Sequence, residues 1–135
     1  MSINAVIAAP VEHNSGGTIY QFARLSLEDW AAYCEHIQST RLKQISALDL
    51  PPNEKQQLYR EAVREAIDPE EMFRHAMTLT GMRWLLHHSV AKHHEEVGLG
   101  DVGAIVGNLV HMTELVERIA DLPEGDEDAD PPQAQ

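Results

Sequence analysis

The segment "LLHHSVAKHHEEV", residues 85–97, contains four histidines within eight positions and two glutamates directly after them. Imidazole nitrogens bind zinc and other transition metals, and they act as general acids and bases near neutral pH. Two ligands for one ion on a helix must be three or four residues apart, because only this spacing brings them together on one face. His87, His88, His93 and His94 offer separations of one, five, six and seven positions.

The pair His87 and His94 shares a helix face but lies about 10 Å apart along a straight helix, so one zinc ion cannot bridge it. Chelation would require the helix to end before His93, or a ligand from elsewhere such as His111. A protonated imidazole near a helix end is favoured by the negative end of the helix dipole. We therefore predict an exposed histidine cluster at a helix end, with no metal and no cofactor.

Other residues with catalytic chemistry have simpler structural explanations. Cys34 lies on the apolar stripe of a predicted helix, which favours a buried thiol over a nucleophile. The acidic pairs at 28–29 and 70–71 lie at predicted helix starts, where carboxylates offset the helix dipole. The segment "GLGDVG" has neither the preceding strand nor the glycine spacing of a dinucleotide site, and no GxxxxGK, HExxH or GxSxG motif occurs. We expect no catalytic residue and no enzymatic activity.

Composition narrows the choice of partners and compartment. The chain has 135 residues, a length typical of one domain, and a single cysteine, so no intrachain disulfide can form. No apolar run approaches the roughly 18 residues that a membrane span requires, and no basic leader precedes the apolar patch in "MSINAVIAAP". The net charge of −12 repels nucleic acid but suits solubility or a partner with a basic surface. We expect a cytoplasmic protein that binds protein partners, with self-association as a further option, and neither nucleic acid nor membrane.

The N-terminal part of the chain lacks a helical period. Residues 1–17 are predicted to form an irregular arm, and "GGTIYQFARL" after it favours a short extended segment or hairpin arm. A helix is predicted from Ser26, where "SLED" resembles a capping box. Its apolar stripe has a gap at Arg41. The arginine either holds a polar contact or extends from the edge of the stripe into solvent, and the second reading is favoured. The stripe consists of Leu27, Trp30, Cys34, Ile37, Ile45 and Leu48.

Further helices follow from proline and capping signals. "LPPN" ends the first helix, and a second is predicted over about 54–67. "DPEE" starts a third, with Asp68 as its cap and a bend or break at Gly81. The inward residues of the second helix are predicted to be Leu58, Ala62, Val63, Ala66 and Ile67.

The predicted fold is mainly α: a compact bundle of four to six helices with a short extended N-terminal arm and a disordered acidic C-terminal tail. The arm covers residues 1–17, a single helical domain covers 18–123, and the tail covers 124–135, where "EGDEDADPPQAQ" carries five acids and no large apolar residue.

Large apolar side chains surround much of the predicted helix over residues 72–90. A helix that is apolar on more than one face must bury the second face, either against its own protein or against a partner. Methionines adapt to varied partner shapes. We predict a groove beside this helix that binds an apolar or amphipathic partner helix, and burial by the protein's own helices is the alternative. The predicted partner-binding residues are Met72, Met77, Met82, Trp84 and Leu86.

Four segments together resemble the small tail assembly chaperones of long-tailed bacteriophages. They are "GGTIYQFARLSLEDWAAY", "EEMFRHAMTLTGMRWLLHHSVAKHH", "GLGDVGAIV" and "LVERIADL", within residues 16–122. In that family a glycine precedes a helix rich in tryptophan or leucine, as in residues 81–86 here. The chain departs from the family pattern where His93 and His94 replace a turn with proline, and where Asp101-Val102 replaces an acidic helix start.

The resemblance implies a non-enzymatic role in virion assembly. Members of the family coat the hydrophobic, helical tape measure protein in the host cytoplasm until tail tube subunits displace them. Alternatives are a structural virion component of the tail or connector, an acidic helical adaptor or inhibitor, and a mimic of nucleic acid. The last needs a regular array of carboxylates, and the acids here are scattered. A metal-dependent enzyme ranks last.

Overall fold

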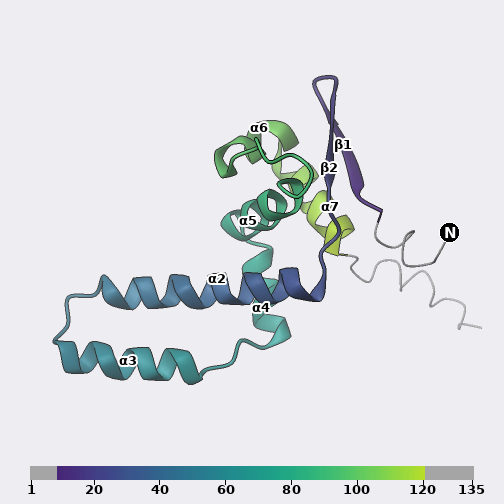
Figure 1. Ribbon diagram of the computed structural model, residues 1–135. Helices are drawn as coiled ribbons and strands as arrows, with labels where there is room; N and C mark the ends of the chain where they lie inside the picture. The colour runs from purple at the N-terminus through teal and green to yellow at the C-terminus, as the bar shows by residue number, and fades with distance from the viewer. Residues whose placement is uncertain (1–8, 121–135) are drawn as a thin grey trace, which may run out of the picture. The chain divides into compact units, whose positions relative to one another are not determined.

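The computed structural model describes residues 9–120, which form two compact units (Figure 1). Unit 1 comprises residues 9–26 and 76–120, and unit 2 comprises residues 27–75. The described range contains six α-helices and one two-stranded sheet, which confirms a mainly helical fold with a short extended N-terminal segment. The sequence predicts one domain over 18–123, whereas the structure describes this range, through residue 120, as parts of two units. The predicted acidic tail lies outside the described residues.

Unit 1 begins with a β-hairpin of strands β1 (Val11–Ser15) and β2 (Thr18–Phe22). The strands are antiparallel, and they are joined by Gly16 and Gly17, whose φ angles of 59° and 90° suit glycine. The prediction of an irregular arm over residues 1–17 is therefore wrong for β1. Exposed polar residues alternate there with buried or half-buried ones, and this period of two is the pattern of a half-buried strand.

The helices of unit 1 are α5 (Leu79–Val90), the short 3-10 helix η1 (Leu99–Asp101), α6 (Val102–Val106) and α7 (Leu109–Ala120). Helices α5 and α7 pack against each other and supply most of the core. The core side chains of these two helices that are at most 5% exposed are Met82, Leu85, Leu86, Val90, Met112, Leu115, Val116 and Ile119.

The segment after β2 is tied to the ends of both helices. The Ala23 N–H donates a hydrogen bond to the Ser89 carbonyl at 3.3 Å, and the buried Ser89 hydroxyl donates to the Ala23 carbonyl at 2.6 Å. The Leu25 N–H donates to the Ile119 carbonyl at 2.8 Å. These bonds satisfy backbone groups that would otherwise be buried without partners.

The predicted helix over residues 72–90 is two helices. The helical structure is interrupted at Met77 and Thr78. Gly81 lies inside the first turn of α5 and not at this interruption. The Thr78 hydroxyl accepts a hydrogen bond from the Gly81 N–H at 3.1 Å, which is the geometry of a helix N-cap. The capping threonine therefore determines where α5 begins.

Unit 2 contains α2 (Leu27–Ser46), α3 (Pro52–Arg64) and α4 (Pro69–Ala76) except its last residue, Ala76, which belongs to unit 1. Helices α2 and α3 form an antiparallel hairpin (Figure 1). Its register is given by two side-chain bonds to backbone carbonyls, from Gln38 Nε2 to Ala62 at 2.9 Å and from Lys55 Nζ to Ser46 at 2.9 Å.

Helix α3 buries very little of its surface. Ala62 is its one buried residue, and the prediction that Val63 points inward is wrong, since its side chain is 64% exposed. The helix also ends at Arg64, three residues before the predicted end. A hairpin of two helices has only one inner face for each helix, so the other apolar residues of α3 remain at the surface.

Helix α4 is attached to α2 by polar and sulfur contacts. The Glu71 N–H donates to the Asp68 carboxylate at 2.8 Å, which confirms the predicted cap. Arg41 of α2 forms an ion pair with Glu71. The predicted alternative of a polar contact for Arg41 is therefore confirmed, and the favoured prediction, that Arg41 extends into solvent, is wrong. The Cys34 thiol lies 3.5 Å from the Met72 sulfur.

Within residues 9–120, no helix is both long enough and apolar enough to span a membrane.

Candidate functional site

The five predicted partner-binding residues belong to two units, Met72 to unit 2 and the other four to unit 1. Met82 is 2% exposed and Leu86 is fully buried, so both are core residues of unit 1. The Met82 sulfur accepts a hydrogen bond from the Thr113 hydroxyl of α7 at 3.7 Å. The prediction that these two side chains face a partner is therefore wrong, because α7 covers this side of α5.

The remaining three residues lie in different surroundings. Trp84 is half-buried, and its ring stacks on His88 of the next turn, with centroids 4.9 Å apart and planes 9° from parallel. Met72 is half-buried beside the Cys34 thiol in unit 2. Met77 is 36% exposed in the break between α4 and α5. Helical periodicity placed the five on one helix, and the break at residue 77 separates them.

The four histidines have separate structural contacts. Helix α5 ends at Val90, so His87 belongs to the helix and His94 to the turn after it. The His87 ring hydrogen-bonds through Nε2 to the Val97 carbonyl at 3.1 Å. Among these four histidines only His93 is exposed and the other three are half-buried, so the predicted exposed cluster is wrong for those three.

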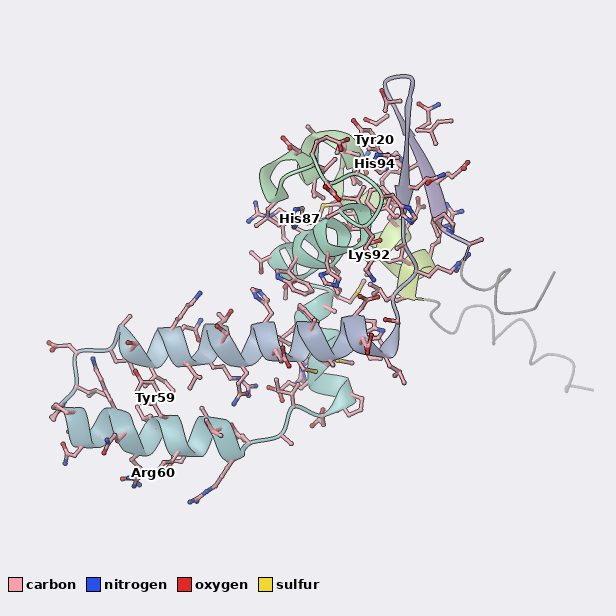
Figure 2. All side chains as sticks on the ribbon, in the orientation of Figure 1. Tyr20, Tyr59, Arg60, His87, Lys92 and His94 are labelled. Atoms are coloured by element: carbon pink, nitrogen blue, oxygen red, sulfur yellow. The ribbon has the colours of Figure 1, made fainter. Side chains whose placement is uncertain are left out.

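His94 supports the outer edge of β2. Its Nε2 accepts a hydrogen bond from the Gln21 N–H at 2.9 Å, and its ring lies edge-on to Tyr20 with centroids 5.2 Å apart (Figure 2). An accepting Nε2 carries no proton, so the proton of this neutral imidazole is on Nδ1, which faces Glu96 at 3.8 Å. No group of three histidine, cysteine, aspartate or glutamate side chains in residues 9–120 is placed to hold a metal ion. His94 ties the turn at 91–97 to β2, and His87 ties the end of that turn to α5.

An open groove runs along the hairpin of unit 2, and we call it the α2–α3 groove. Its larger part has a volume of about 480 Å³. This part is lined by Ser39, Leu42, Lys43, Ser46, Tyr59 and Val63. Figure 2 shows Tyr59 on the side of α3 that faces α2, with Arg60 on the outer side. A smaller hollow of about 270 Å³ continues past the shared residue Val63 and is lined also by Cys34, Glu35, Gln38, Glu65, Ala66 and Ile67.

Local sequence explains why the groove exists. The α2 residues along it recur at steps of three and four, which places them on one face of the helix. Two of them, Ser39 and Ser46, are small and leave space between the helices, while Tyr59 and Val63 supply an apolar wall. Cys34, predicted to be a buried thiol, is half-buried and lines the smaller hollow.

The two ends of the groove carry opposite charge. Lys43 lines the end near the turn between α2 and α3, and Glu35 and Glu65 line the other end. All three side chains are exposed. The middle, between Leu42 and Val63, is apolar, so the groove suits an apolar ligand with charges near both ends.

Two titratable groups of α2 have shifted pKa values. Burial raises the pKa of the Tyr33 phenol to about 12, and the neighbouring Cys34 adds a smaller rise. Burial, together with the positive charge of Lys43, lowers the pKa of His36 below 6.5. His36 stacks on Tyr33, with ring centroids 6.2 Å apart.

The lining of the groove holds a thiol, hydroxyls and charged ends. This site was not predicted from the sequence. A signal was present: α3, which begins at Pro52, has few large apolar residues, too few to anchor it to a core of its own.

Comparison of the chain with protein-family models, with curated proteins and with solved structures found no match.

Proposed function

We propose that this protein is a non-enzymatic assembly chaperone that binds an apolar, amphipathic helix of a protein client in the α2–α3 groove. The observation that carries the proposal is the open apolar groove beside a helix that buries only Ala62. An exposed apolar groove rimmed by polar residues is the usual form of a protein-binding surface.

The resemblance to phage tail assembly chaperones names the client class. A tape-measure-type protein is long, helical and apolar, and a small partner with a net charge of −12 would keep it in solution. The proposed binding face is the α2–α3 groove and not the face of α5, since Met82 and Leu86 are occupied in the core. Many weak sites along a repetitive client give a strong overall interaction.

Two valines of nearly equal exposure allow a matched test. Val63 lines the groove and is 64% exposed, whereas Val110 lies at the start of α7 in unit 1 and is 65% exposed. A labelled amphipathic helical peptide is titrated with the wild-type protein, with Val63→Glu and with Val110→Glu, and anisotropy reports binding. Val63→Glu should weaken binding at least about tenfold, because a carboxylate must then be desolvated in the complex.

Val110→Glu should bind the peptide within about twofold of wild type, since an exposed charge outside the groove touches no ligand. Circular dichroism of each variant establishes that it is folded. Equal binding by both variants would show that the groove is not the client site. Co-expression with an insoluble tape-measure-type protein then tests the client class, and only the wild type and Val110→Glu should keep it soluble.

A further inference from the structure

The α2–α3 groove is complementary to itself. Along α2, Ser39 lies midway between Glu35 and Lys43, four residues from each. Four residues of helix span about 6 Å, so the opposite charges lie at about equal distances on either side of Ser39. On the facing helix Val63 adjoins Ala62, whose carbonyl accepts a hydrogen bond from Gln38, so Val63 is at nearly the same level as Ser39.

A two-fold axis through this central point would superpose unlike ends. It would bring Lys43 of one copy to the level of Glu35 of the partner subunit, and the reverse pair would form at the other end. Glu65, near the same end as Glu35, adds to the negative charge that each lysine meets. The small Ser39 and the apolar Val63 would lie at the centre, where close approach is possible. Such a self-complementary patch is what a two-fold dimer requires.

We propose that, without a client, a second copy of this chain covers the groove, with the two α2–α3 hairpins antiparallel about an axis between Ser39 and Val63. The dimer covers the surface that the proposed function assigns to the client, so a client binds by displacing the second copy. This regulatory role of the dimer rests on the proposed function. The dimer itself requires no client.

The size of the face sets the strength of this dimer. A hairpin about 20–30 Å long and two helices wide offers roughly 500 Å² per copy, whereas a stable interface of standard size buries about 800 Å² per partner. An interface below the standard size suits a reversible dimer, which a client that is present as many linked helices can displace.

Sedimentation velocity of the full chain, from about 1 µM to about 500 µM, measures the dimer directly. The wild type should change from monomer to dimer across this series. Lys43→Glu should weaken self-association at least about tenfold, because it places like charges opposite each other at both ends of the interface. The variant Glu35→Lys/Glu65→Lys should weaken it similarly. All three positions are exposed, so both variants should stay folded.

Mixing the two variants tests the antiparallel geometry. In a mixed pair, the glutamate at 43 of one chain meets lysines of the other at 35 and 65, and the second interface end is also matched. The mixture should therefore dimerise although neither variant does so alone. Monomer at every wild-type concentration would overturn the inference, as would a dimer insensitive to Lys43→Glu or a mixture that stays monomeric.

The outcome is separable from that of the proposed function. A monomeric chain that still binds the peptide refutes only the dimer and leaves the groove to the client. A dimer that forms as described and binds no peptide refutes only the chaperone role.

Discussion

The two units differ in how much of each helix they bury. In unit 1, α5 buries six of its twelve residues and α7 buries four of twelve. In unit 2, α2 buries three of twenty residues and α3 one of thirteen. Burial of apolar area is the main favourable contribution to folding, so α5 and α7 stabilise unit 1 from within. The hairpin of unit 2 keeps apolar surface exposed, and that surface is what a partner can use.

The strongest test of this comparison places matched truncations in the two units. Leu86 is fully buried on α5, and Leu86→Ala should lower the free energy of unfolding by about 3 kcal/mol, through lost burial and a cavity in the core. Val63 is 64% exposed on α3, so Val63→Ala should lower the free energy of unfolding by less than about 0.5 kcal/mol. Urea unfolding followed by circular dichroism gives both values. Similar losses at the two positions would show that the hairpin is not a weakly packed surface.

A second test concerns the best-buried ring of α2. Because the pKa of Tyr33 is raised to about 12, the folded state holds the phenol proton more tightly than the unfolded chain, whose value is 10.0. The stability from this group is complete below pH 10 and falls as pH rises through 10 toward 12. The ultraviolet tyrosinate signal should show a late ionisation step from Tyr33.

Tyr33→Phe is the control for that titration. The variant should lack the late step, and its free energy of unfolding should fall less steeply above pH 10 than that of the wild type. If a late ionisation step persists in Tyr33→Phe, it comes from another tyrosine. The burial of the Tyr33 phenol in unit 2 would then be refuted as its cause.

Local sequence signals predicted much of the fold correctly. Capping residues act within a few positions, so the cap at Asp68 was predictable, whereas α2 ends at Ser46, before the prolines that were predicted to stop it. The start of α5 was missed because Gly81 has a low helix propensity, whereas the Thr78 cap determines the boundary. Strand β1 was missed because its residues are mostly polar and it is held by pairing with β2, which composition alone does not report.

The candidate site was harder to predict than the fold. An apolar residue at helical spacing looks the same whether its own protein or a partner covers it. Met82 and Leu86 were therefore predicted at the surface and are buried, while Val63 was predicted inward and is exposed. The difference depends on which helices lie beside each face, and that is a property of tertiary packing. The opposite charges at the groove ends also become meaningful only once the antiparallel register of α2 and α3 is known.

The smallest effect is expected at His36, which is exposed on α2. Burial and then Lys43 lower its pKa below 6.5, so the folded state binds the proton more weakly than the unfolded chain does. The free energy of unfolding should therefore decrease slightly as pH falls through 6.5, and His36→Asn should remove this part of the slope. Lys43→Gln should move the imidazole midpoint, measured by proton NMR, back toward 6.5 without reaching it, because burial is the larger cause. A wild-type midpoint at or above 6.5 would mean that the His36 ring is open to solvent on all sides. This face of α2 would then be even more exposed than the burial of its residues indicates.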